Sequence, residues 1–239
     1  METPILIGLS RQMLMKRQLS VIANNIANAS TVGFKSENMM FSEHLAEAGK
    51  NEKISFVRGS GIIRDRSMGE LVDTANSLDL AISGRGYFSV ENRFGVRYKR
   101  NGHFRMDELR QIVNSDGHPV LSENEQPIEL RPNDREVTIS KNGDVSTESG
   151  KIGKIQVFNF QNENLLRRMS NGLYLSPLPP EVSESPVVLQ GKLEQSNVET
   201  ITEVTKMIEL VRAYESASRL IEGEHDRERR AIQTLTKMN

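Results

Sequence analysis

The stretch from Ala23 to Lys35, ANNIANASTVGFK, governs how the rest of the chain is interpreted. It closes an apolar N-terminal segment that is predicted to be a long helix, and it carries three asparagines: Asn24, Asn25 and Asn28. Asparagine is a mediocre helix former, because its amide competes for nearby backbone groups. The cluster is either a frayed helix end that stops at Gly33, or a set of amides that bond neighbouring subunits, where a charge would cost too much to bury. We take the second interpretation as the hypothesis.

The helix before this stretch starts at a good signal, Thr3-Pro4, with Thr as cap and Pro at the first helical position. Its apolar side chains lie nearly all round the helical wheel, and they include Ile5, Leu9, Met13, Leu14, Met15, Leu19, Ile22 and Ile26. A helix of this kind is buried on all sides, either as a core helix or by partner chains. We predict that Leu9, Met13 and Ile26 contribute with the three asparagines to an assembly interface.

A second long helix is predicted at the C-terminal end of the sequence, capped by Ser196 or Asn197. Spacings of three and four predict a heptad seam of mostly apolar side chains, interrupted by Ser218, His225 and Glu228. Its apolar members complete the predicted assembly interface: Val204, Met207, Val211, Tyr214, Ile221, Ile232 and Leu235. The helices at the two ends are expected to pair as an antiparallel coiled coil.

Between the helices the sequence is rich in short strands. They alternate with turn signals such as Asn92-Arg93, Asp116-Gly117 and Asn142-Gly143. This punctuation is typical of an antiparallel sandwich or a partly open barrel. A short helix is predicted at 37–48 and a turn at Gly59-Ser60-Gly61. The expected fold class is therefore α+β, with a helical assembly domain formed by 1–35 and 197–239, a connector at 36–75 and a β-rich domain at 76–196.

Several passages resemble the flagellar rod and hook proteins. They are GLSRQMLMKRQLSVIANNIANASTVGFK near the start, RYKRNGHF, SDGHPVL and SKNGDV in the middle, and GKLEQSNV and MIELVRAYE near the end. The first 28 residues are most similar to the proximal-rod members. This resemblance implies a structural subunit of the basal-body proximal rod, polymerising through its terminal helices around the export channel. A distal-rod or hook subunit of the same family is the alternative.

The resemblance also implies the partners and the location. The partners would be other rod proteins, copies of the same chain and the flagellar type III export apparatus. The location would be the periplasmic rod, reached without a cleaved signal peptide, and the start of the sequence has no basic segment of the secretory type. One position departs from the family pattern: Arg110 stands where the family usually has glycine. The turn there must use Asp107 and Glu108, or adopt a different shape.

Composition and motifs weigh against other classes of function. The 239 residues carry a net charge of −1, which gives no bulk attraction for nucleic acid. The absence of Cys excludes thiolate metal sites and a catalytic thiol. No GxSxG, P-loop or HExxH motif occurs, and the four histidines form no short-spaced metal pair. We therefore expect no enzyme activity, no cofactor, no metal, no nucleic acid and no small-molecule substrate.

A peripheral membrane protein that binds through its N-terminal helix is the remaining alternative. Such a helix would gather Lys and Arg along one polar face. Here Arg11, Lys16 and Arg17 are few and dispersed.

Overall fold

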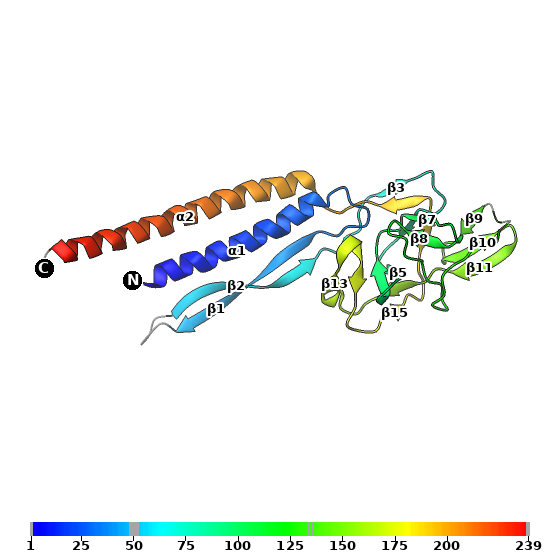
Figure 1. Cartoon of the computed structure of the whole chain (residues 1–239), viewed down its shortest axis with the longest axis horizontal. Helices are drawn as coiled ribbons and strands as arrows, with labels where there is room; N and C mark the ends of the chain where they lie inside the picture. Colours follow the sequence, from blue (N-terminus) through cyan, green and yellow to red (C-terminus); the bar gives the residue numbers. More distant parts are fainter. Residues whose placement is uncertain (1, 48–52, 133, 135, 238–239) are drawn as a thin grey trace. The chain divides into compact units, whose positions relative to one another are not determined.

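The structure is a computed structural model that describes residues 2–47, 53–132, 134 and 136–237. It consists of two compact units, one formed by 1–27, 37–63 and 199–239 and the other by 28–36 and 64–198. Long helices at both ends and a β-rich middle confirm the α+β class (Figure 1). No helix in the described ranges has the length and apolarity that a bilayer span requires.

The first unit contains both helices and a two-stranded sheet. Helix α1 (Glu2–Ala27) lies beside helix α2 (Thr200–Lys237), and the two run in opposite directions (Figure 1). Strands β1 (Glu37–Glu47) and β2 (Lys53–Arg64) pair with each other, and β1 packs against α1.

The helix predicted at 37–48 is therefore wrong, and so is the turn predicted at Gly59-Ser60-Gly61, which lies inside β2. Helix propensity favours the sequence ENMMFSEHLAE, but tertiary contacts override it. The side-chain amide of Asn25 bonds both backbone groups of Glu37, which holds the start of β1 in an extended conformation. Residues 37–63 thus belong with the helices, while the rest of the predicted connector belongs with the second unit.

The second unit is built from small antiparallel sheets. The largest has the strand order β13-β14-β6-β5-β12-β15, and another has the order β11-β10-β9. The remaining pairs are β16-β4, β17-β3 and β7-β8. The strand bounds are β3 Leu71–Asp73, β4 Leu80–Ile82, β5 Tyr87–Asn92, β6 Gly95–Lys99, β7 Phe104–Met106, β8 Ile112–Asn114, β9 Val137–Ile139, β10 Asp144–Thr147, β11 Gly150–Lys154, β12 Val157–Asn159, β13 Arg167–Arg168, β14 Tyr174–Leu175, β15 Glu181–Val182, β16 Val188–Gln190 and β17 Lys192–Glu194. Short 3₁₀ helices lie at Glu163–Leu165 and Ser170–Gly172.

Two apolar clusters hold this unit together. The larger is centred on Phe88 and Phe104, whose rings meet edge to face at 5.3 Å. The smaller is aromatic and gathers Tyr87, Tyr98, Phe160 and Tyr174 with Leu166. Edge-to-face ring pairs add about 0.5–1.5 kcal/mol each beyond the burial of their area. The β-rich unit therefore has an internal core of its own.

The turn at Arg110 keeps the shape that suits a glycine. Arg110 has φ 62°, in the left-handed region, and its N–H donates to the carbonyl of Asp107. The carboxylate of Asp107 accepts from the N–H of Gln111, so the turn uses Asp107, which is part of one of the two alternatives that the sequence left open. The Arg110 guanidinium donates to the carbonyl of Asp134 at 2.7 Å. Side-chain bonds thus offset a backbone conformation that costs a non-glycine residue about 1–2 kcal/mol.

Candidate assembly surface

The contacts between α1 and α2 fix their register. A methyl group added at Gly8 would come within 2.9 Å of Cγ1 of Ile221. Towards the other end of α1, the amide of Asn25 donates to the carboxylate of Glu203 at 2.9 Å. Gly8 and Asn25 on α1 are separated by nearly the same number of residues as Ile221 and Glu203 on α2, and the order along the chain is reversed. The two helices are therefore antiparallel, and their register is the same at these two contacts.

The protected face of α2 differs from the seam that the sequence predicted. The buried and half-buried positions in the described part of α2 are Glu203, Met207, Leu210, Ala213, Tyr214, Ala217, Ser218, Ile221 and Glu224, most of them at alternating steps of four and three. Met207, Tyr214, Ser218 and Ile221 of the predicted seam are half-buried. Val204 and Val211 are 39% and 38% exposed and lie outside this inward stripe, so their place in an assembly interface stays a prediction. The side chains of Glu228, Ile232 and Leu235 lie outside the described residues.

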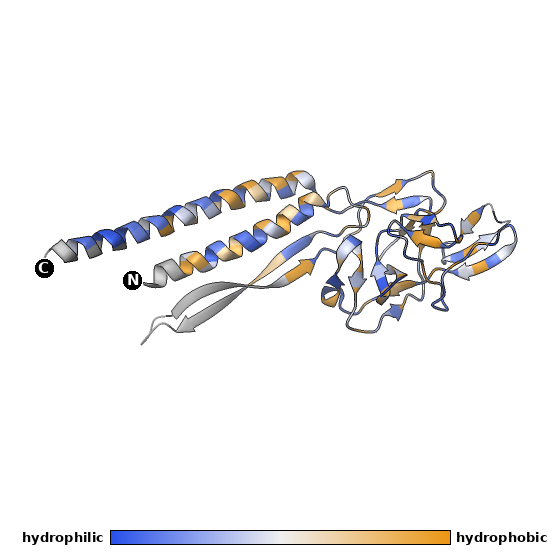
Figure 2. Ribbon diagram, in the orientation of Figure 1, coloured by the Kyte–Doolittle hydropathy of each residue, from blue (hydrophilic) through white to orange (hydrophobic). Residues whose placement is uncertain are grey.

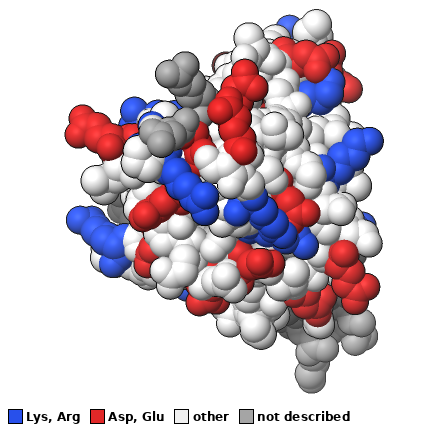
Figure 3. All heavy atoms as spheres, turned by 90° about the vertical axis from the view of Figure 1, so that its right-hand side faces the viewer, with Lys and Arg blue, Asp and Glu red and all other residues white. Residues whose placement is uncertain are grey.

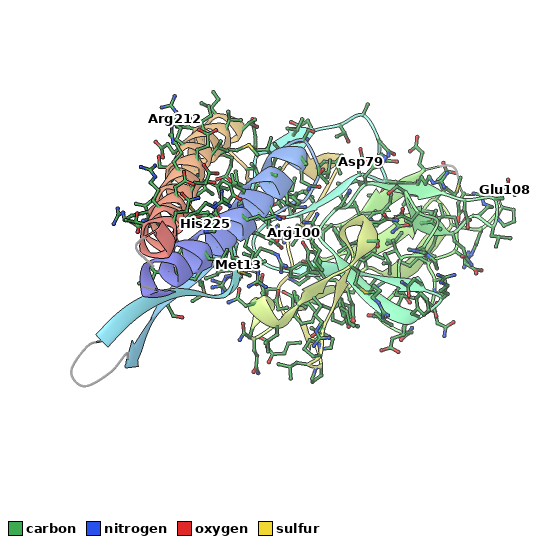
Figure 4. All side chains as sticks on the ribbon, turned by 60° about the vertical axis from the view of Figure 1, so that its left-hand side comes forward. Met13, Asp79, Arg100, Glu108, Arg212 and His225 are labelled. Carbon is green, nitrogen blue, oxygen red and sulfur yellow. The ribbon has the colours of Figure 1, made fainter. Side chains whose placement is uncertain are left out.

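The predicted residues of α1 also divide into inner and outer ones. Asn25 is buried, and Ile26 and Asn28 are half-buried. Leu9 and Met13 are 48% and 67% exposed, and Asn24, nearer the end of the helix, is also exposed. Figure 4 marks Met13 on α1 and Arg212 on α2. Only part of the predicted set is thus used inside the chain, and the rest faces outward.

Asn25 is a junction between three segments of the first unit. Its NH₂ group donates to the Glu203 carboxylate and to the carbonyl of Glu37, both at 2.9 Å. Its carbonyl oxygen accepts from the N–H of Glu37 at 3.0 Å. Lys206 donates to the other oxygen of Glu203 at 2.7 Å. The NH₂ group and the carbonyl oxygen of Asn25 are thus used within the chain, and the role of the asparagine cluster in bonding neighbouring subunits stays a prediction.

Sequence reasoning missed Glu203 because a charged residue was not expected to be buried. A buried carboxylate is costly unless it is paired and hydrogen-bonded. Here Asn25 and Lys206 supply the partners, and Glu203 takes the inward position that the sequence assigned to Val204.

The second unit contains a matching junction at Glu194. One carboxylate oxygen pairs with the ammonium of Lys35 and accepts from the N–H of Gly69, while the other accepts from Nε of Arg100 at 2.6 Å. The remaining donors of Arg100, labelled in Figure 4, reach the carbonyls of Ile82, Gly84 and Gly86. Burial lowers the pKa of Lys35, and the bond to Glu194 opposes this shift.

Asn197 completes that junction in place of the helix cap that was predicted. Its oxygen accepts from the N–H of Ser36 at 2.7 Å, and its NH₂ group donates to the carbonyl and hydroxyl of Ser67. Helix α2 begins later, at Thr200, and its first backbone bond runs from Glu203 to the carbonyl of Glu199. The prediction that Ser196 or Asn197 caps α2 is therefore wrong. Asn197 instead joins segments far apart in sequence.

The described residues of the β-rich unit line polar hollows. A cavity of about 350 Å³ lies among Asn28, Phe34, Asn101, Asp116, Arg168 and Asn171, with other polar residues. Within the described ranges, no group of His, Asp or Glu side chains is arranged to hold a metal ion. On the face seen in Figure 3, Lys and Arg are interspersed with Asp and Glu. That face presents no continuous basic surface of the kind that binds nucleic acid.

Comparison with known protein families locates three matching segments. Residues 5–35 match the model described as "Flagella basal body rod protein", and 81–147 match "Flagellar hook protein FlgE/F/G D1 domain". Residues 189–234 match "Flagellar basal body rod FlgEFG protein C-terminal".

Similar proteins cover the whole chain. The flagellar basal-body rod protein FlgF of Caulobacter vibrioides is 35% identical, over 100% of both chains. The FlgF protein of Mesorhizobium japonicum is 31% identical over 98% of both. The FlgG protein of Buchnera aphidicola is 32% identical over 90% of this chain and 91% of its own.

Proposed function

Because the chain belongs to the flagellar basal-body rod proteins, of the FlgF type, we propose that it works as a subunit of the proximal rod, binding its neighbours through the outward faces of α1 and α2. The family is structural rather than enzymatic, and its members assemble with other rod proteins in the basal body. The work is mechanical: the subunit transmits torque and encloses the export channel.

The observation that carries this proposal is the apolar outer face of α2. Ile201, Val204, Ile208 and Val211 follow one another at steps of three and four, and Ile201 is 84% exposed. Figure 2 shows apolar residues over the N-terminal half of α2 and polar ones over its C-terminal half. Large contiguous apolar surfaces mark interaction sites in soluble proteins. In this proposal, Leu9, Met13, Val204 and Val211 remain in the assembly interface, and Ile201 and Ile208 join them.

The inward faces have a different role in this proposal. Met207, Tyr214 and Ile221 pack α2 on α1, and the alternating steps of four and three on α2 support a short antiparallel coiled coil within one chain. The pair then presents a preformed rod segment to its neighbours. Passage through the type III export apparatus, without a cleaved signal peptide, delivers the subunit to the periplasm.

The FlgG-type relatives support the alternative of a distal-rod or hook subunit. Among the relatives described above, however, the FlgF proteins match over 98–100% of the chain and the FlgG protein over 90%. This difference favours the proximal rod.

Locating the subunit in isolated basal bodies tests the proposal. A small tag fits the exposed turn between β5 and β6, where the Asn92 side chain accepts from the N–H of Phe94. Electron microscopy with a tag-binding label is expected to place it in the rod, and deletion of the gene is expected to abolish rod completion and swimming. Label on the filament, or normal rods in the deletion strain, would contradict the proposal.

A further inference from the structure

A polar cavity in the β-rich unit takes no part in the proposed function. Its volume is about 350 Å³, and its walls come from segments far apart in the sequence: the loop 28–34, Asn101, the turn 115–116 and the segment 168–174. Gly33 lets the loop approach Asn101 closely, because a side chain added at Gly33 would come within 2.7 Å of the Asn101 backbone nitrogen. The volume lies within the range of small-molecule sites, about 300–1,000 Å³.

Asn171 has an uncommon backbone conformation at the cavity wall. Its φ of 60° lies in the left-handed region, although it is not a glycine. Its NH₂ group donates to one carboxylate oxygen of Asp116 at 2.8 Å. The Asn171 carbonyl oxygen and the other Asp116 oxygen accept no hydrogen bond from the described residues. Residues held in such conformations cluster at ligand-binding sites, and here two acceptors stay available to a ligand.

Two further side chains at the cavity are held in place by contacts with their neighbours. The side-chain oxygen of Asn101 accepts from the N–H of His103 at 2.8 Å, while its NH₂ group has no acceptor among the described residues. The guanidinium of Arg168 lies over the ring of Phe34, 4.6 Å from its centroid. Stacking of this kind fixes the plane of a guanidinium. The polar groups of the cavity are therefore oriented before any ligand arrives.

The groups in the walls indicate the chemistry of the ligand. Asp116 and Arg168 are the charged residues among the described ones that line the cavity, and their charges offset each other. Asn101 offers donors, Asn171 and Asp116 offer acceptors, and the hydroxyl of Ser115 can do both. A neutral ligand with several groups that both donate and accept matches this set. Hydroxyl groups have this property, and a saccharide ring carries them on neighbouring carbons.

An extended peptide also carries donors and acceptors, but it needs pockets for its alternate side chains. Of the apolar residues in the walls, Phe34 and Tyr174 are almost fully buried, which leaves little apolar surface for such pockets. We propose that the cavity binds a neutral saccharide, whose hydroxyl groups bond Asn101, Asn171 and Asp116.

Titration of the ¹⁵N-labelled full chain with sugars, followed by NMR, tests the proposal. The probes are glucose, N-acetylglucosamine and the β-1,4-linked trimer of N-acetylglucosamine. The side-chain NH₂ signals of Asn101 and Asn171 are expected to shift, while that of Asn142, an exposed turn residue that does not line the cavity, stays in place. For a ligand of roughly 12 to 15 heavy atoms, the Kd is expected to be on the order of 1 mM.

Two variants remove one group each without disturbing the backbone. Asn171→Gly removes the carboxamide and suits the left-handed conformation. Asn101→Asp keeps the acceptor for the His103 N–H and loses the NH₂ donors. Each is expected to weaken binding by about 3- to 10-fold. The matched control, Asn142→Gly, is expected to bind as the unchanged chain does.

The source of the saccharide follows from the probes. Binding of the trimer at least about 10-fold tighter than that of N-acetylglucosamine, about 1.4 kcal/mol, would identify a glycan strand, and equal binding would identify a single sugar; both results support the proposal. The proposal is overturned if no saccharide shifts these signals at about 10 mM, ten times the expected Kd. It is also overturned if both variants bind like the control, or if the neutral peptide N-acetyl-trialanine amide binds more tightly than every sugar.

Discussion

Replacing Asn25 by alanine tests the junction between α1, β1 and α2. The change removes three hydrogen bonds, leaving the buried carboxylate of Glu203 with Lys206 and the backbone groups of Glu37 without their partner amide. A hydrogen bond to a charged group contributes about 1.5–3 kcal/mol, and an unsatisfied buried polar group costs about 1–3 kcal/mol. Allowing for water that reaches Glu37, the free energy of unfolding is expected to fall by about 3–5 kcal/mol.

The matched control is Asn24→Ala, one residue earlier on the same helix. The Asn24 side chain is exposed, and alanine raises helix propensity by up to ~0.7 kcal/mol. The change in stability is therefore expected to be below about 1 kcal/mol.

The assay follows urea unfolding with two probes. Far-UV circular dichroism is dominated by α1 and α2, while the fluorescence of tyrosine is mainly that of the buried Tyr87, Tyr98 and Tyr174 in the β-rich unit, since the chain has no tryptophan. Asn25→Ala is expected to shift the first transition and to leave the second nearly unchanged.

A double-mutant cycle with Glu203→Leu measures the pair directly. Residues that share a buried hydrogen bond couple by about 0.5–3 kcal/mol. The reasoning is refuted if Asn25→Ala costs no more than Asn24→Ala, or if the cycle shows no coupling.

Three further changes probe other parts of the molecule. Arg110→Ala keeps the left-handed backbone and loses the bond to Asp134, whereas Arg110→Gly loses the same bond and also relieves the backbone strain. In urea unfolding the glycine variant is therefore expected to be about 1 kcal/mol more stable than the alanine variant. The reverse order would contradict this account. Burial lowers the pKa of Lys99 from 10.5 to about 8 in the folded chain. Between pH 8 and pH 10.5 the unfolded chain therefore binds a proton that the folded chain has lost, and the free energy of unfolding rises with pH in this range. Lys99→Met is expected to abolish this rise and to add about 3 kcal/mol at pH 7; unchanged unfolding curves at pH 7 and pH 9.5 would refute the assignment. Gly8→Leu is expected to push α2 away at Ile221 and to lower helix stability by about 1–3 kcal/mol, with partial rescue by Ile221→Ala; a loss that Ile221→Ala leaves unchanged would place the clash elsewhere.

Local sequence patterns were enough to predict the features that depend on interactions between neighbouring residues. The Thr3-Pro4 start signal and the apolar N-terminal segment predicted α1, and spacings of three and four predicted α2. Short strands separated by Asn-Gly and Asp-Gly turns predicted the β-rich middle. The predicted turn at Asn92-Arg93 lies between β5 and β6. The turn at Asn142-Gly143 is also present, with Gly143 at φ 87°. These features can be predicted because each depends on a pattern of a few neighbouring residues.

Contacts between residues far apart in the sequence select the inward face of α2 and supply the partners of the buried charges. Spacings of three and four residues on α2 are compatible with two neighbouring seams, one through Val204 and one through Glu203. Apolarity alone favours the seam through Val204. The buried position goes to Glu203 because Asn25, 178 residues away, donates to its carboxylate. The same holds for Glu194 with Lys35, 159 residues away, and for the strand at 37–47, which Asn25 holds extended. No local pattern encodes these choices, because the free energy of burying a polar group depends on a partner that only the folded chain brings within hydrogen-bond distance.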